Sequence, residues 1–192
     1  MFNKQFFSKL KSDYAASVSE RRQIIAAANT ILHDAKRVIF ALHRHELKNA
    51  MAALSDIETR LKKLEKTFGY ARLNQEGAYT AAGEEYAEAK LFYLVVANKK
   101  LEKFKGVNLS TENYLGGLAD LLGEMARQAV NLAADGKLKE VTALKNLADD
   151  IMAELVNFDM SGYLRTKYDQ ARGHLRKLEQ INYEISLRSC NT

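Results

Sequence analysis

The sequence contains no proline and only one cysteine, and both absences restrict what the protein can be. Mixed folds normally use proline in turns and at sheet edges, so 192 residues without proline favour long helices. The lone Cys190 excludes an internal disulfide framework and a cysteine-based zinc site. It also favours a reducing compartment, and we therefore expect a cytoplasmic protein.

Long apolar runs are missing as well. No stretch approaches 18 consecutive apolar residues, which is the length that a membrane-spanning helix requires. The first residues, MFNKQFFSKLKSDYAAS, have no long apolar core, which argues against a signal peptide. We expect no membrane partner.

The overall composition is typical of a globular protein. Hydrophobic residues make up 47% and charged residues 28%, which is too apolar for a disordered chain. This length suits one core, and we expect residues 1–192 to form a single domain. The net charge of +5 and the pI of about 9.2 fit an acidic partner such as nucleic acid, or simply a basic soluble protein.

Hydrophobic periodicity indicates helices throughout, with no convincing β-alternation. Gly69, Gly106 and Gly136 each follow a helical pattern, as a C-terminal cap should, and Ser110 is expected to cap the start of the next helix. The first helix could break near Ser17–Ser19. The predicted fold is all-α, a single-domain bundle of about six to seven long antiparallel helices. The helices are expected at 3–45, 47–67, 77–104, 111–134, 137–157 and 161–188.

Two glutamates lie on an apolar face of the helix expected at 77–104. At roughly 100° per residue, Glu85 and Glu88 are separated by about 60°, and Phe92 and Val96 share their face. Burying an ionised carboxylate is costly unless something compensates for its lost hydration. A cation, a basic partner or a raised pKa is therefore required, unless this is an ordinary solvated face.

A second acidic pair, Asp120 and Glu124, lies one turn apart on the following helix. Periodicity places this pair and Arg127 opposite the apolar stripe, which favours a solvated face. Gly116 and Gly117 weaken that interpretation, because glycine lets another backbone or a ligand approach closely. The residues alone leave both interpretations open.

Several segments resemble the family of translin and translin-associated factor X. YLGGLADLLGEMARQAVNLAADGKL resembles the central segment of factor X, and EEYAEAKLFYLV resembles its preceding acidic helix. AKRVIFALHR, residues 35–44, is similar to the N-terminal helix of that family. LRTKYDQARGHLRKLEQINYEISLR, residues 164–188, is similar to the C-terminal helix shared by translin and its partner.

This resemblance implies an all-α fold, binding of RNA or single-stranded DNA, and assembly into a hollow octameric shell. The factor-X branch carries a metal-dependent ribonuclease site with two acids on each of two helices. Those acids correspond to Glu85, Glu88, Asp120 and Glu124, which the resemblance assigns as metal-binding and catalytic residues. Hard ions such as Mg²⁺ or Mn²⁺ suit a set of four carboxylates. We therefore expect a Mg²⁺-dependent endoribonuclease acting on single-stranded or short RNA.

The chain is shorter than the eukaryotic factor and lacks a basic nuclear-targeting run, so it resembles a compact prokaryotic relative. The sequence leaves open whether a separate translin subunit exists, and a homo-oligomer, which the resemblance implies to be an octamer, could serve both roles. Phosphate contacts are expected from basic residues near the acids. Arg127 is the first candidate, and the weaker ones, which an ordinary solvated face would also explain, are Lys36, Arg37, His43 and Arg44. No Ser/His/Asp or Cys/His grouping is visible, so surface or capping roles are expected for His33, His43, His45 and His174.

Three other functions are weighed against this one. A non-catalytic translin-type binder of single-stranded RNA or DNA would show salt-dependent binding without cleavage. A ferritin-like di-metal bundle requires Glu-x-x-His motifs, which the sequence lacks. A helical scaffold would use its amphipathic helices only for self-association.

Overall fold

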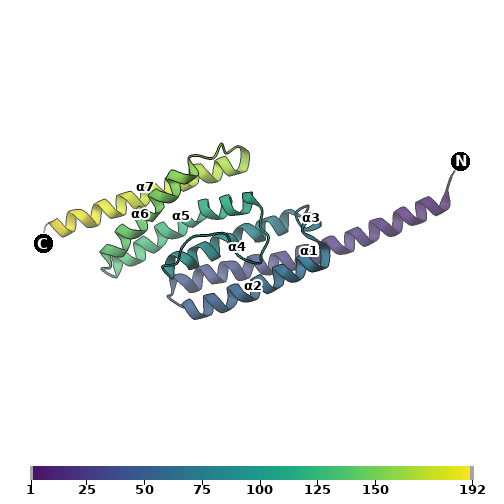
Figure 1. The fold of residues 1–192 in the computed structure, drawn as a ribbon, viewed down its shortest axis with the longest axis horizontal. Coiled ribbons are helices and arrows are strands. Elements are labelled where there is room, and N and C mark those ends of the chain that lie inside the picture. The colour runs from purple at the N-terminus through teal and green to yellow at the C-terminus, as the bar shows by residue number, and fades with distance from the viewer. Residues whose placement is uncertain (1, 191–192) are drawn as a thin grey trace.

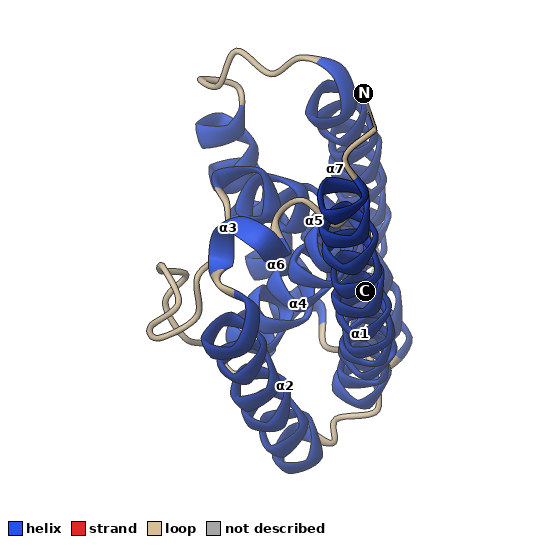
Figure 2. Cartoon of the chain, turned by 90° about the vertical axis from the view of Figure 1, so that its right-hand side faces the viewer, coloured by secondary structure: helices blue, strands red, loops and turns tan. Residues whose placement is uncertain are grey.

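The chain folds into an elongated bundle of helices (Figure 1). The structure is a computed structural model that describes residues 2–190, and the side chains of residues 188–190, Cys190 among them, lie outside this description. Within the described residues Figure 2 shows helices and loops and no strand, which confirms the all-α prediction. The helices are α1 (Lys4–His43), α2 (Leu47–Phe68), α3 (Tyr70–Leu73), α4 (Gly77–Val96), α5 (Thr111–Ala134), α6 (Leu138–Leu155) and α7 (Gly162–Cys190).

Helix α1 is continuous over 40 residues, without the break considered near Ser17–Ser19. The side chain of Asn3 caps its start by accepting a hydrogen bond from the backbone N–H of Phe6 at 3.1 Å. Neither glycine nor proline occurs between its ends, so nothing in the sequence interrupts its backbone hydrogen bonds. The helix stops where His45 adopts a left-handed backbone with φ 62°.

Helices α4 and α5 lie at the centre of the bundle. Helix α4 packs against α1, α2 and α5, whereas α5 packs against α4, α6 and α7 (Figure 1). The buried apolar side chains form one core cluster, which includes Tyr86 and Phe92 of α4 and Leu122 and Met125 of α5. Because α4 is covered on several sides, charged side chains on it lie close to apolar surroundings.

The predicted helix at 77–104 is too long. Helix α4 ends at Val96, and Asn98 then turns the chain with a left-handed φ of 52°. The following loop is held down by the buried side chains of Phe104 and Val107. Gly106, with φ 74°, lies in this loop, so its predicted role as a helix cap is wrong.

The other punctuation signals are confirmed. Gly69 ends α2 with φ 78°, and Gly136 follows α5 with φ 75°. Ser110 caps α5 by accepting a hydrogen bond from the backbone N–H of Asn113 at 3.1 Å. The short helix α3 was not predicted. No helix within the described part of the chain has the length and hydropathy needed to cross a bilayer.

Candidate acidic site between the central helices

Two glycines allow α4 and α5 to approach closely. A Cβ atom on Gly117 would lie 2.8 Å from the Cβ of Ala87 and 2.9 Å from the backbone nitrogen of Glu88. A Cβ atom on Gly116 would overlap the carboxylate of Glu84. The expectation that these glycines let another backbone approach is therefore confirmed, and the approaching backbone is that of α4.

This approach brings the four predicted acids, Glu85, Glu88, Asp120 and Glu124, into electrostatic contact. Glu88 is only 8% exposed. Burial, reinforced by the neighbouring Asp120, Glu85 and Glu124, raises the pKa of Glu88 to about 9. Burial also raises the pKa of Glu85, with Asp120 and Glu124 adding to the rise and Lys36 opposing it. The two helices therefore contribute to one acidic cluster.

Helix α7 adds a cation to this cluster. The ammonium of Lys167 donates to Asp120 and lies 2.9 Å from Oε1 of Glu84. The hydroxyl of Tyr163 donates to the same Glu84 oxygen at 2.6 Å. Burial disfavours the charge on Lys167, but its hydrogen bonds to Asp120 and Glu84 outweigh that cost and raise the pKa of the ammonium. Lys167 is therefore a permanently charged link between α4, α5 and α7.

His43, at the end of α1, contacts Glu124, the fourth acid of the cluster. Its Nε2 atom lies 2.5 Å from Oε2 of Glu124, and its Nδ1 atom lies 3.1 Å from Oε1 of Gln128. The imidazole is almost fully buried and packs against the ring of Phe92, with 4.8 Å between centroids. Both ring nitrogens face oxygen atoms, so the imidazole is held in place between Glu124 and Gln128.

A cleft of about 630 Å³ opens beside this cluster. Glu84, Glu85, Asp120, Tyr163 and Lys167 line it, together with residues from the start of α5. Among the residues that the structure describes, no three His, Cys, Asp or Glu side chains are arranged to hold a metal ion. Asp120 is instead directed to Lys167, and Glu124 is bound to His43.

The predicted phosphate-binding residues divide into two groups. Lys36 and Arg127 lie beside the acidic cluster, with Lys36 Nζ 4.0 Å from Glu85 Oε2 and Arg127 Nη1 3.8 Å from Glu124 Oε2. The other two pair with carboxylates outside the cluster. Arg37 lies 3.3 Å from Asp34, and Arg44 lies 3.0 Å from Glu46.

Three residues of the site were missed by the sequence argument. Glu84 was not singled out, because the sequence argument selected its neighbour Glu85, which lies closer to the apolar face of the helix. His43 was expected to have a surface or capping role or to be a weak phosphate contact, yet its side chain is buried and bound to Glu124. Lys167 gave no signal, because its partner Asp120 is 47 positions away in sequence and such a pairing exists only in the folded chain.

The sequence is similar to that of known proteins of one family. A model of the Translin family matches residues 19–189. An uncharacterized protein of Methanocaldococcus jannaschii is 29% identical over 164 residues, which is 83% of this chain and 73% of that protein. Translin of Gallus gallus is 28% identical over 92 residues, or 47% of this chain and 40% of translin, so this match spans less than half of either protein.

Two solved structures share the fold. The structure of AfC3PO in complex with duplex RNA superposes with a TM-score of 0.86, at 16% identity, over 97% of this chain and 99% of that one. The structure of apo-NeC3PO has a TM-score of 0.83, at 18% identity, over 95% of this chain and 97% of that one. The match confirms the predicted fold class over almost the whole chain.

Proposed function

This chain belongs to the Translin family, and on that premise we propose that it is a Mg²⁺-dependent endoribonuclease acting on single-stranded or short RNA. Glu85, Glu88, Asp120 and Glu124 are its metal-binding and catalytic residues in this proposal. The protein works as a homo-oligomer of eight chains.

The observation that carries this proposal is the buried acidic cluster itself. The pKa of Glu88 rises to about 9 because burial and three neighbouring acids all oppose its ionisation. Such an arrangement destabilises the fold at neutral pH unless a cation compensates. Lys167 alone supplies little relief to Glu88, since its effect on the pKa of Glu88 is the smallest of the five contributions.

The donor set suits Mg²⁺ or Mn²⁺. Both ions prefer carboxylate oxygens, and the cluster offers four carboxylates from two rigid helices. When bound, the ion would supply Lewis-acid chemistry for the hydrolysis of a phosphodiester. Asp120 and Glu124 would have to turn away from Lys167 and His43 to reach the ion.

In the alternative role in which Glu124 does not bind the ion, it keeps His43 as its partner, and proton transfer would fall to this pair. The 2.5 Å contact between Nε2 and Oε2 allows a proton taken up by Glu124 to be shared with the imidazole. A carboxylate that can pass on its proton in this way fits the role of general base. Gln128 fixes the orientation of the imidazole through Nδ1.

Binding of RNA relies on basic side chains at the edge of the cluster. Lys36 and Arg127 are both about half exposed and sit beside Glu85 and Glu124, so they can reach phosphate oxygens near the ion. Arg37 and Arg44 are more exposed and extend the basic surface along α1. Because phosphate contacts dominate such binding, affinity should fall steeply with salt.

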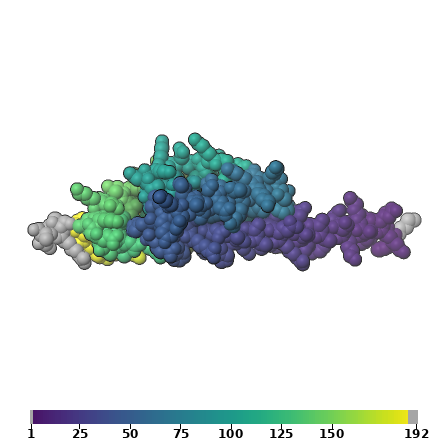
Figure 3. All heavy atoms as spheres, turned by 90° about the horizontal axis from the view of Figure 1, so that it is seen from below, coloured from purple at the N-terminus to yellow at the C-terminus, as the bar shows by residue number. Residues whose placement is uncertain are grey.

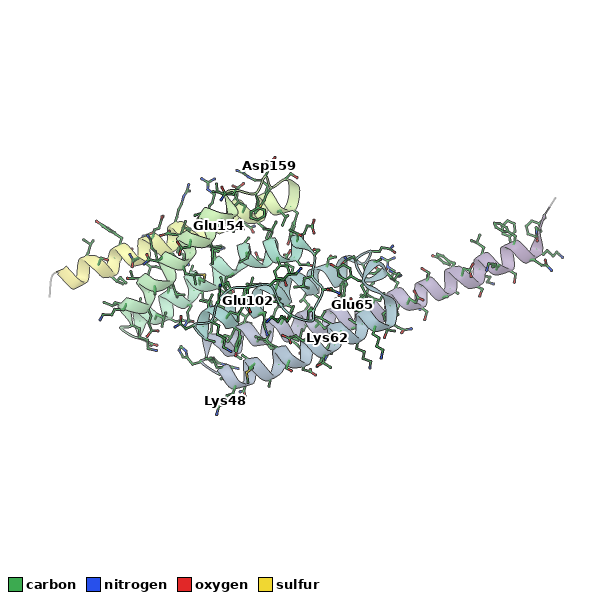
Figure 4. The ribbon with its side chains drawn as sticks, viewed as in Figure 1. Lys48, Lys62, Glu65, Glu102, Glu154 and Asp159 are labelled. Carbon is green, nitrogen blue, oxygen red and sulfur yellow. The ribbon has the colours of Figure 1, made fainter. Side chains whose placement is uncertain are left out.

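The test is cleavage of a short single-stranded RNA with Mg²⁺, with Mn²⁺ or with EDTA. Glu88→Gln and Asp120→Asn should abolish cleavage while leaving the fold intact. Glu154→Gln and Asp150→Asn are matched controls, because both acids are exposed on α6 and distant in sequence from the cluster (Figure 4 labels Glu154). Cleavage that survives in EDTA or in both site variants would contradict the metal site.

A non-catalytic binder of single-stranded RNA or DNA is the second candidate. It is favoured by the similarity to proteins named Translin and by the lack of a preformed metal arrangement among the described side chains. In that case RNA would bind to wild type and to Glu88→Gln equally, binding would weaken with salt, and no product would form with either ion.

A further inference from the structure

Two aromatic rings beside the acidic cluster are left more than half exposed. Phe40 of α1 is 55% exposed, and Tyr163 of α7 is 61% exposed. Helices α1 and α7 run along the same side of the bundle in Figure 2, and both contribute side chains to the cleft beside the acids. Burial in the core of this chain therefore does not account for either ring.

Each of these rings packs against a cation of the site. Cζ of Arg127 lies 5.3 Å from the centroid of the Phe40 ring, and Nζ of Lys167 lies 5.3 Å from the centroid of the Tyr163 ring. A cation within about 6 Å of a ring centroid is attracted to the face of the ring. The hydroxyl of Tyr163 also donates to Glu84 at 2.6 Å, which fixes the orientation of this ring. One face of each ring is thus supported by the protein, and much of the remaining surface is free.

The same two cations contact the acids of the cluster. Nη1 of Arg127 lies 3.8 Å from Oε2 of Glu124, and the ammonium of Lys167 pairs with Asp120. Asp120 and Arg127 are seven positions apart on α5. At 3.6 residues per turn they share one face of the helix, separated by about 10 Å along its axis. The two rings therefore lie on either side of the acids, each one contact away from them.

The surface around the rings is basic, which indicates the kind of partner that covers it. Lys36 precedes Phe40 by one turn of α1, and its side chain is 53% exposed. The side chain of Arg127 is 48% exposed. A purely apolar partner would bury these cations without an anion, which is costly. A single nucleic-acid strand supplies a phosphate for each cation and a flat base for each ring.

We propose that Phe40 and Tyr163 form a stacking pair, on which the bases of the nucleotides to either side of the cleaved phosphodiester are stacked. This proposal rests on the proposed function, because it takes RNA as the ligand and the acids as the place of cleavage. The spacing is suitable, since about 10 Å corresponds to about three nucleotides at 3.4 Å each. Bases within a duplex are already stacked on each other, so the pair selects an unpaired strand.

The test is the affinity of the full-length protein, in EDTA, for an adenylate oligomer and for an abasic ribose-phosphate oligomer of the same length. Phe40→Leu and Tyr163→Leu should each weaken binding of the adenylate oligomer by about 5- to 150-fold, as the loss of one stacked base does. Binding of the abasic oligomer should not change, because it has the same charge and no base. Tyr163→Phe keeps the ring and should retain the affinity of wild type for both.

Matched controls exist on the same two helices. Tyr14 lies 26 positions before Phe40, or about 40 Å along α1, on the part of this helix that projects beyond the bundle (Figures 1 and 3). Tyr183 lies 20 positions after Tyr163, or about 30 Å along α7, and is 63% exposed. Tyr14→Leu and Tyr183→Leu should bind both oligomers like wild type. Double-stranded RNA should bind equally to wild type, Phe40→Leu and Tyr163→Leu.

Fluorescence gives a second measurement that does not depend on affinity. The sequence contains no tryptophan, so Phe40→Trp and Tyr163→Trp each introduce a single indole at the proposed contact. Stacking of a base on the indole should quench its emission when the adenylate oligomer saturates the protein. The abasic oligomer at saturation should leave the emission unchanged.

Three results would overturn the stacking pair. The first is an equal loss of affinity for both oligomers in the leucine variants, and the second is equal quenching by both. The third is a lower molar mass of these variants by light scattering, because the rings would then lie between chains. All binding is measured without metal, so a protein that discriminates the oligomers but never cleaves RNA contradicts the nuclease proposal alone. Wild type that cleaves RNA but binds both oligomers equally contradicts the stacking pair alone.

Discussion

Lys167 of α7 and Asp120 of α5 form a direct ion pair beside the acidic cluster, and the same ammonium lies 2.9 Å from Glu84 of α4. One cation thus joins three helices at the edge of the cleft. It occupies the position at which a divalent ion would have to compete for Asp120. In the proposed metal site, an ion that binds Asp120 would therefore have to displace Lys167, which would lower the contribution of this ion pair to the stability of the bundle.

Replacing Lys167 with methionine should therefore lower the stability of the metal-free protein. The loss of a partly buried cation that pairs with two acids should lower the free energy of unfolding by about 2–3 kcal/mol, which is less than for a fully buried pair. Mn²⁺ should then stabilise the variant more than wild type, because Asp120 is released. Melting with EDTA and with Mn²⁺ measures both effects. Lys145→Met, which removes a single ion pair with Asp149 within α6, is the control and should change little. Equal increases in melting temperature with Mn²⁺ in all three proteins would contradict the proposed competition between Lys167 and the ion for Asp120.

Glu88→Gln should raise the melting temperature of the metal-free protein, and Glu85→Gln should do so to a smaller extent. The pKa of Glu88 is about 9 in the fold, against 4.5 for an unperturbed glutamate. Stability that depends on this group is complete below pH 4.5 and is lost as the pH rises towards 9. The variant lacks this dependence, so its advantage should grow between pH 5 and about 9. Thermal melting in EDTA across this range is the measurement, and a lower melting temperature for Glu88→Gln at pH 8 would refute it.

Gly117→Ala should destabilise the bundle, because the new Cβ would meet Ala87 and the backbone of Glu88 at 2.8 and 2.9 Å. Separating α4 from α5 should cost about 1–3 kcal/mol, as overpacking generally does. Gly173→Ala on α7 is the matched control, since nothing lies within 4 Å of its added Cβ. That change should instead stabilise by about 0.5–1 kcal/mol through helix propensity. Chemical denaturation distinguishes the two, and similar effects at both positions would show that the close approach is unimportant.

His43→Leu should reduce cleavage without abolishing the binding of RNA. The variant loses the imidazole that orients Glu124 as general base, and changes in such supporting residues typically cost roughly 10- to 100-fold in activity. His33→Leu removes an exposed histidine from the same helix and should have no effect. Cleavage rates and filter-binding affinities separate the two roles. A parallel loss of binding in His43→Leu would assign the histidine to the RNA surface.

The fold class and most helix boundaries were predictable because they depend on local chemistry. The capping serine at 110, the left-handed glycines at 69 and 136, and the lack of proline act over a few residues. The prediction of helix boundaries failed after Val96, where tertiary contacts determine the conformation of the backbone. The loop after Val96 reads as helical in the sequence, but burial of Phe104 and Val107 holds it in another shape.

For the site, the sequence by itself determined which carboxylates share a helix face and that glycines flank the second pair. Only the tertiary structure decided that the two helices meet, that Glu84 joins them, and that Lys167 and His43 are their partners. The physical reason is the distance along the sequence over which each interaction acts. Periodicity fixes the direction in which a side chain leaves its own helix, whereas an ion pair between residues 47 positions apart depends on how separate helices pack.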